Sequence, residues 1–216
     1  MSVEDVDQLA IRKGLFMLTP RLPILAVLLM VLAGAASAQR PGPEFRRPSD
    51  CEFGDPRTKL ELMERSYERV LIKGFTQMVG LSVRGADIRI DAVEFKDARP
   101  AAERAMGLIV ALREQAETPR ESRAFLDYDE IDRLLKALDA VTRVSESVTK
   151  LASFEAHYRT LGDLEVRVFR QTRQSGTAGS IATGVCTRVV GLLTLDELER
   201  FRAHIVEAKA RLDEIK

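Results

Sequence analysis

Two stretches of the chain share one pattern of apolar and polar positions. Each begins with an apolar run, continues with a helix-start signal and ends in an amphipathic segment; the stretches are 125–134 and 192–201. Beyond each start, apolar side chains recur at steps of three and four residues: Ile131, Leu134, Leu138 and Val141 in the first, and Leu198, Phe201, Ile205 and Ala208 in the second. This spacing places them on one helix face. We therefore predict two amphipathic helices, each packed on an apolar surface.

The start of each predicted helix carries a capping signal. Asp127 is followed three residues later by Glu130, and Thr194 by Glu197. In a capping box the first side chain accepts from a backbone N–H of the first turn, and the acid accepts from the N–H of the capping residue. Capping and the helix dipole also explain the other acids near Asp127, so no metal site is expected there.

Apolar runs and alternating positions predict antiparallel strands before each helix. The predicted strands are 70–81, 88–96, 106–113 and 122–126 before the first helix, and 151–160, 164–172, 180–183 and 185–193 before the second. The alternation changes phase at Ala92, which indicates either a β-bulge or a strand whose buried face changes. Residues 59–67 suit a short helix or an extended segment.

These elements predict an α+β fold: an antiparallel β-sheet with two helices, built as a tandem ββββα-ββββα repeat. The first repeat is expected to span 59–147 and the second 148–216, both within one globular domain.

The N-terminal region has the features of a signal peptide. An apolar run over 22–34 is followed by Ala36-Ser37-Ala38, which predicts a signal over 1–38 with cleavage before Gln39. The acids that precede the run are unusual in a signal, and a start at Met17 would remove them. The run is shorter than the ~20 residues of a spanning helix, although an uncleaved anchor is the alternative. We expect export to the periplasm or the medium, and no membrane span after processing.

The segment after the predicted cleavage site, 39–58, contains four prolines and two glycines and is expected to be an extended lead-in. Cys51 in this segment and Cys186 are the only cysteines. In an oxidising compartment such a pair predicts a disulfide, and two unrelated thiols are the alternative. Two cysteines alone do not complete a structural zinc site.

Charge and motifs exclude several classes of function. The chain has 33 basic and 33 acidic residues, so it has no overall attraction to nucleic acid or anionic lipid. The Gly-rich stretch 175–180 does not lead from a strand into a helix, as a phosphate-binding loop would, and no nucleophile elbow or metalloprotease motif occurs. We predict no catalytic, cofactor-binding or metal-binding residues, and no enzyme activity.

One group of like charges remains as a candidate binding surface. Basic side chains gather on the predicted strands of the second repeat, at Arg159, Arg167, Arg170 and Arg188. Beside aromatic residues on a sheet they would form a modest anion patch, and a solvated sheet face is the alternative interpretation.

The order of four strands and a helix, repeated, with paired helix starts at 127–130 and 194–197, resembles the Whirly, PC4-like and Pur-type single-stranded nucleic-acid-binding proteins. The resemblance covers about 67–216 and implies their fold, but no individual binding residue can be transferred. The chain is also similar to exported bacterial proteins, which implies no particular activity.

Two functions follow as hypotheses. The first is an exported, non-enzymatic module that binds a protein or another envelope component. The alternative is a single-stranded nucleic-acid or polyanion binder that uses the four arginines. A third hypothesis is an enzyme whose catalytic residues are too far apart in the chain to form a recognisable motif.

Overall fold

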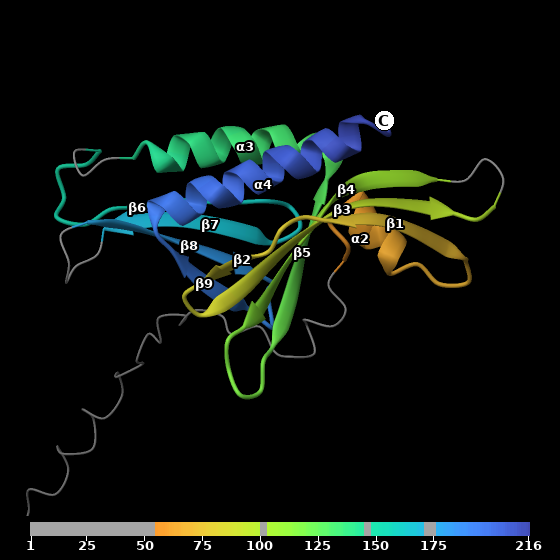
Figure 1. Cartoon of the computed structure of the whole chain (residues 1–216), viewed down its shortest axis with the longest axis horizontal. Helices are drawn as coiled ribbons and strands as arrows, with labels where there is room; N and C mark the ends of the chain where they lie inside the picture. Colours follow the sequence, from red (N-terminus) through yellow and green to blue (C-terminus); the bar gives the residue numbers. More distant parts are fainter. Residues whose placement is uncertain (1–54, 100–102, 145–147, 171–175) are drawn as a thin grey trace, which may run out of the picture. The chain divides into compact units, whose positions relative to one another are not determined.

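The computed structural model describes residues 55–99, 103–144, 148–170 and 176–216. They form two antiparallel sheets and three helices, an α+β arrangement (Figure 1). The predicted signal peptide over 1–38, most of the lead-in, and Cys51 lie outside the described residues.

The first sheet has the strand order β1-β3-β4-β5, with β2 also paired to β3. Its strands are β1 (Leu71–Gln77), β2 (Leu81–Val83), β3 (Ala86–Asp97), β4 (Arg104–Glu114) and β5 (Glu121–Asp127). The second sheet has the order β6-β7-β8-β9. Its strands are β6 (Glu155–Arg159), β7 (Leu164–Arg170), β8 (Thr177–Thr183) and β9 (Val189–Leu193). The helices are α2 (Lys59–Glu64), α3 (Tyr128–Thr142) and α4 (Leu195–Asp213).

The expected strand over 70–81 is divided into β1 and β2, which follow one another along the same edge of β3. Met78 lies opposite Ile90, to which its N–H donates over 2.8 Å, whereas Leu81 lies opposite Ile88. Val79 and Gly80 therefore face a single residue of β3, which is the geometry of a β-bulge. The bulge separates the two strands.

The change of phase at Ala92 has a different cause from a bulge. β3 pairs with β4 in one register from Ala86 to Lys96. Ile90 and Ala92 are buried in the large core on one face of the sheet, and Phe95 is buried in a smaller core on the other face. The second interpretation of the phase change is therefore correct: the buried face changes along the strand.

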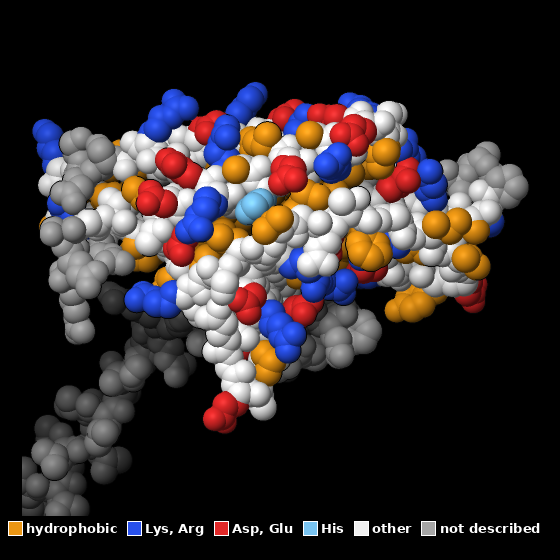
Figure 2. Space-filling model, in the orientation of Figure 1, with side chains coloured by type: hydrophobic (Ala, Val, Ile, Leu, Met, Phe, Trp, Pro, Cys, Tyr) orange, Lys and Arg blue, Asp and Glu red, His pale blue; other side chains and the backbone are white. Residues whose placement is uncertain are grey.

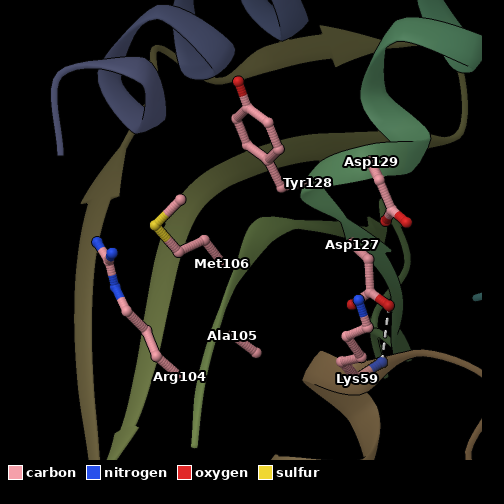
Figure 3. Close-up of a pocket in the computed structure, with 7 residues that line it drawn as sticks. All are labelled: Lys59, Arg104, Ala105, Met106, Asp127, Tyr128 and Asp129. Atoms are coloured by element: carbon pink, nitrogen blue, oxygen red, sulfur yellow. Dashed lines mark hydrogen bonds between the residues drawn. The ribbon is translucent and has the colours of Figure 1, made fainter. Parts of the chain in front are cut away.

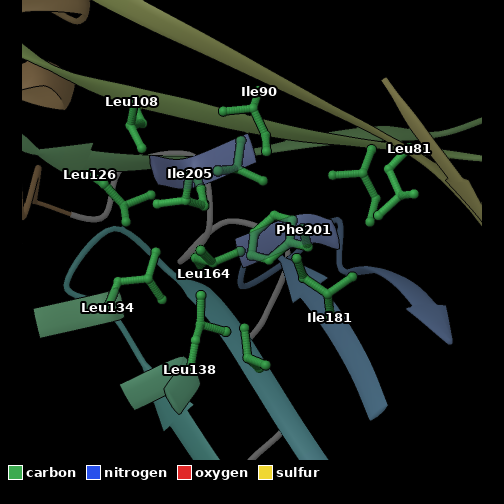
Figure 4. Packing of buried hydrophobic residues seen from close by; sticks show 14 of the residues in the cluster. Leu81, Ile90, Leu108, Leu126, Leu134, Leu138, Leu164, Ile181, Phe201 and Ile205 are labelled. Carbon is green, nitrogen blue, oxygen red and sulfur yellow. The ribbon is translucent and has the colours of Figure 1, made fainter. Parts of the chain in front are cut away.

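The large core lies between the two sheets and under α3 and α4 (Figure 4). Its fully buried side chains include Leu134 and Leu138 from α3 and Phe201 and Ile205 from α4. Each such side chain stabilises the fold by roughly 1.5–3 kcal/mol relative to exposure. The helices run antiparallel, since Arg202 Nε lies 2.6 Å from an Asp139 oxygen and Lys209 Nζ lies 3.8 Å from Asp132.

Two isolated bridges join the sheets at their edges. Phe125 at the end of β5 pairs with Gly162, and Arg84 pairs with Leu192 of β9. The Phe125 N–H donates to the Gly162 carbonyl over 3.3 Å, and the Leu192 N–H donates to the Arg84 carbonyl over 2.9 Å. The first and second halves of the described chain are thus connected by main-chain hydrogen bonds as well as by the shared core.

The smaller core lies between α2 and the outer face of the first sheet. Leu60 and Met63 of α2 are buried there with Phe95, Ile109 and neighbouring apolar side chains. The segment that suited either a short helix or an extended form is therefore helical over Lys59–Glu64.

Some boundaries in the second half also differ from expectation. β9 begins at Val189 rather than at 185, because residues 184–188 form a turn that includes Gly184 at φ +80°. β8 begins at Thr177 rather than at 180, and 171–175 lie outside the described residues. None of the described helices has the length and the hydropathy of a membrane-spanning helix.

Candidate functional site

The predicted helix starts are placed at the two helix N-termini of the large core. Thr194 Oγ1 accepts from the Glu197 N–H over 3.2 Å, and Glu197 accepts from the Thr194 N–H over 2.7 Å. Asp127 and Glu130 occupy the equivalent positions of α3, with capping-box geometry. These four residues stabilise the starts of α3 and α4, directly after β5 and β9.

Glu130 makes a contact that the local pattern could not indicate. Its side chain accepts from the Asp127 N–H over 3.3 Å and from the Leu161 N–H, in the turn between β6 and β7, over 3.1 Å. The residue is 4% exposed, and this burial raises the pKa of its carboxyl above the usual value. Glu130 therefore ties the start of α3 to the second sheet.

The arginines of the predicted anion patch are held by acids of the same sheet. The Arg188 guanidinium lies 2.8 Å from Glu165, Arg167 also pairs with Glu165, and Arg167 lies 3.1 Å from Glu155. Burial alone would raise the pKa of Glu165, but hydrogen bonds from Arg188 and Arg167 outweigh it and lower the pKa to about 2. The carboxylate is thus ionised and neutralises part of this surface.

The other two predicted patch residues are also engaged. Arg159 Nε donates to Asp163 over 3.0 Å. Arg170 donates to the Ala152 carbonyl over 3.0 Å. At least three of the four predicted arginines therefore face carboxylates, so the patch carries little excess positive charge.

Cys186 lies in the exposed turn between β8 and β9. Because Cys51 is outside the described residues, the predicted disulfide remains a prediction. No three His, Cys, Asp or Glu side chains converge as metal ligands within the described parts of the chain.

A hollow of about 250 Å³ opens where β4, α2 and α3 meet (Figure 3). Three of its polar side chains, Asp127, Arg104 and Tyr128, already have partners within the protein. Asp127 accepts from the Lys59 N–H over 2.8 Å, and Arg104 donates to Glu94 and to the Ile215 carbonyl. The Tyr128 hydroxyl points toward α4, where it donates to Asp213. The carboxylate, guanidinium and phenol groups of these three residues are thus used in holding α2, β4 and α4 in place.

An exposed surface rich in apolar side chains lies at β1. Ile72 and Phe75 are 54% and 65% exposed, and every residue of β1 after Leu71 is exposed. Val70 and Val79, which flank the strand in the chain, are also exposed, as are Leu62 of α2 and Tyr67 in the segment that leads into β1. Figure 2 shows hydrophobic side chains gathered at the end of the molecule where Figure 1 places β1. Such gathering is typical of an interaction surface rather than of scattered surface residues.

The outer edge of β1 presents main-chain groups with no strand to pair with among the described residues, since β1 pairs there with β3 alone. The Ala98 N–H donates to the Val70 carbonyl, and the Met78 N–H donates to the Ile90 carbonyl. Hydrogen-bonded pairs alternate along an antiparallel ladder, so the even-numbered residues of β1 face β3. Leu71, Lys73, Phe75 and Gln77 therefore direct their N–H and C=O groups outward.

Lys73 is the one charged residue of β1. Its ammonium lies 5.7 Å from the Phe75 ring centroid and 5.6 Å from that of buried Phe95, within cation–π range. An edge lysine and an adjacent bulge are devices by which proteins limit uncontrolled strand pairing. The edge of β1 thus has unpaired main-chain groups and exposed apolar side chains, while Lys73 and the bulge limit which strands can pair with it.

The sequence indicated a strand here but not a binding surface. The only local signal is a strand of seven residues with a single charge, which equally suits a buried strand. No protein-family model matches the chain, and none of the curated proteins matches it.

Proposed function

We propose that the protein is an exported, non-enzymatic module that binds a partner protein, or another envelope component with an extended peptide segment, by adding that segment as a strand to β1. The observation that supports this most strongly is the outward row of main-chain groups at Leu71, Lys73, Phe75 and Gln77 beside exposed apolar side chains. Main-chain pairing at a free edge supplies affinity, and alternate side chains supply specificity.

The side chains of β1 define the chemistry of the segment. Lys73 and Phe75 share the face that bears α2, and Ile72 lies on the opposite face. A complementary segment would place an acid next to Lys73 and apolar residues next to Phe75 and Ile72. We therefore expect an extended, apolar segment with one carboxylate.

Proline substitution separates strand addition from other modes of binding. Lys73→Pro removes an N–H that points outward, so the ladder with β3 retains its hydrogen bonds. Lys73→Ala is the matched control, because it removes the same side chain but keeps the N–H. The purified variants are compared in retention of envelope proteins. We expect the Lys73→Ala protein to retain a partner that the Lys73→Pro protein loses, with both variants folded. Equal retention by the two would exclude strand addition at β1.

We infer that β1 to α3 and β6 to α4 are two copies of one unit related by an internal pseudo-symmetry, as in the Whirly, PC4-like and Pur-type proteins. The order of elements supports this, since a helix follows the last strand of each sheet. A crystal structure in which no single rotation superposes β1 to α3 on β6 to α4 would contradict it.

Export and the disulfide are also proposed. They rest on the apolar run over 22–34, the small residues at 36–38, and the pair of cysteines. Expression of the full chain in bacteria and N-terminal sequencing of the exported form should give Gln39 as the first residue. An intact N-terminus on a membrane-bound protein would contradict cleavage.

Binding of single-stranded nucleic acid or another polyanion through the second sheet is the alternative. It has less support, because Arg167 and Arg188 both lie against the Glu165 carboxylate, and Arg167 also lies against Glu155. Salt-sensitive retention on single-stranded DNA that Arg167→Glu abolishes would favour it over strand addition.

A further inference from the structure

A second hollow, of about 350 Å³, lies between the start of α3 and the turn that joins β6 to β7. Three arginines from separate parts of the chain line it: Arg57, Arg133 and Arg159. Tyr158 and Glu130 also line it. The volume lies at the lower end of the range for small-molecule sites.

Two of the three guanidiniums are held by one carboxylate. Arg57 Nη1 and Arg159 Nε lie 3.1 Å and 3.0 Å from the same oxygen of Asp163. Asp163 adopts φ +66° in the turn before β7, and its side chain is 18% exposed. The Asp163 carboxylate thus fixes the guanidinium groups of Arg57 and Arg159 at the rim of the hollow, and it neutralises only one of their two positive charges.

The third guanidinium has no such partner. Arg133 is exposed on α3 and forms no ion pair of 4.0 Å or less with a carboxylate of the described residues, although its charge acts on Glu130 one turn away. The neighbouring acid, Glu130, is buried and accepts from the Asp127 and Leu161 N–H groups. Its oxygens are therefore hydrogen-bonded to the main chain, although the nearby charge of Arg133 still acts on this carboxyl and opposes the rise of its pKa.

Charge and shape together indicate the ligand. Three arginines against Glu130 and Asp163 leave a net charge of +1 if both acids are ionised (3 − 2). A phosphate group suits such a site, because guanidinium groups bind its oxygens through charge-assisted, often bidentate hydrogen bonds. Tyr158 and the half-exposed side chain of Leu161 add an apolar wall. We propose that this hollow binds a small organic phosphate, with Arg133 and Arg159 on the phosphate and Tyr158 beside the organic part.

Titration of the purified protein with phenyl phosphate, followed by ³¹P NMR at low ionic strength, tests the proposal. We expect saturable binding with a Kd of about 1 mM or tighter. Loss of one charge-assisted contact should weaken binding about tenfold in Arg133→Gln and in Arg159→Gln. Arg123→Gln is the matched control, because Arg123 pairs with Glu64 on the outer face of the first sheet. It should bind as the unchanged protein does.

A second ligand, benzoate, and a second variant, Lys73→Pro, complete the test. Benzoate should bind at least tenfold more weakly than phenyl phosphate, since it has one charge fewer and a planar acid group. The Lys73→Pro variant should keep phenyl phosphate binding, so failure of this proposal and failure of strand addition are distinguishable. If Arg159→Gln does not fold, the exposed Arg133 still supplies the test. Absence of saturation, equal effects of Arg133→Gln and Arg123→Gln, or equal binding of benzoate would each overturn the proposal.

Discussion

The carboxylate of Asp127 accepts a hydrogen bond of 3.0 Å from the backbone N–H of Leu60, which precedes it by 67 residues in the chain. Its other oxygen accepts from the Lys59 N–H over 2.8 Å. Asp127 ends β5 and precedes α3, so one side chain joins the first turn of α2 to the start of a core helix. Because α2 is only six residues long, it depends on such tertiary contacts for its stability.

Replacement of Asp127 should therefore release α2. Asp127→Ala leaves two N–H groups without their acceptor, one of them buried, and we expect the free energy of unfolding to fall by about 3 kcal/mol. Asp127→Asn, which keeps one acceptor oxygen, should lose about half as much. Asp129→Ala changes an exposed acid in the same turn and should lose less than about 1 kcal/mol. Urea unfolding measures all three, and equal losses from Asp127→Ala and Asp129→Ala would contradict this role.

The close approach of the two sheets at Gly162 makes a second prediction. A Cβ at this position would lie 1.8 Å from the Phe125 carbonyl oxygen, so an added methyl group must push the sheets apart. We expect Gly162→Ala to lower the free energy of unfolding by about 2–3 kcal/mol. Gly176→Ala has nothing within 4 Å of the added atom and is the control, with a change of less than about 0.5 kcal/mol. If Gly162→Ala left the free energy of unfolding unchanged, the bridge between Phe125 and Gly162 would not be maintained in solution.

The ion pairs of Glu165 should contribute to acid sensitivity. Its pKa of about 2 in the folded protein is below the ordinary value of 4.5, so the stabilisation is complete above pH 4.5 and is lost as the pH falls toward 2. Glu165→Gln should lower the free energy of unfolding on the order of 2 kcal/mol at neutral pH, with the difference vanishing at low pH. Glu155→Gln, which removes a more exposed partner of Arg167, is the control and should change little. Chemical unfolding at several pH values checks this; a difference that stays constant with pH would refute it.

The predicted disulfide can be tested by thiol labelling. If Cys51 and Cys186 pair, the exported protein should take up no maleimide until it is reduced, although Cys186 lies in an exposed turn. Because the bond would close a long loop, Cys186→Ser should lower the free energy of unfolding by roughly 4 kcal/mol on chain-entropy grounds. Labelling of either cysteine without reductant would show that the thiols are separate.

The features that sequence could predict are those that depend on neighbouring residues. The helix starts at Asp127 and Thr194 follow from contacts within one turn, and the apolar faces of α3 and α4 follow from a regular spacing. The change of phase at Ala92 was also informative, because a strand buried on opposite faces along its length must change phase.

The features that sequence could not predict depend on which strands lie side by side. Val79 and Gly80 form a bulge only because of the register with β3, and β1 is exposed only because it is the last strand of its sheet. The anion patch was expected from arginines close together in the chain. Its charges are offset because Arg188 of the β8–β9 turn reaches Glu165 of β7, a contact set by strand order.

Amide hydrogen exchange along β1, resolved by residue, tests strand addition most directly. It compares the free protein with its complex with a partner that the Lys73→Ala protein retains and the Lys73→Pro protein loses. The account predicts that Leu71, Lys73, Phe75 and Gln77 exchange rapidly in the free protein and about tenfold or more slowly in the complex. Ile72, Gly74 and Thr76, whose N–H groups face β3, should be protected in both states. Unchanged exchange at the four outward residues, with new protection elsewhere, would contradict the account.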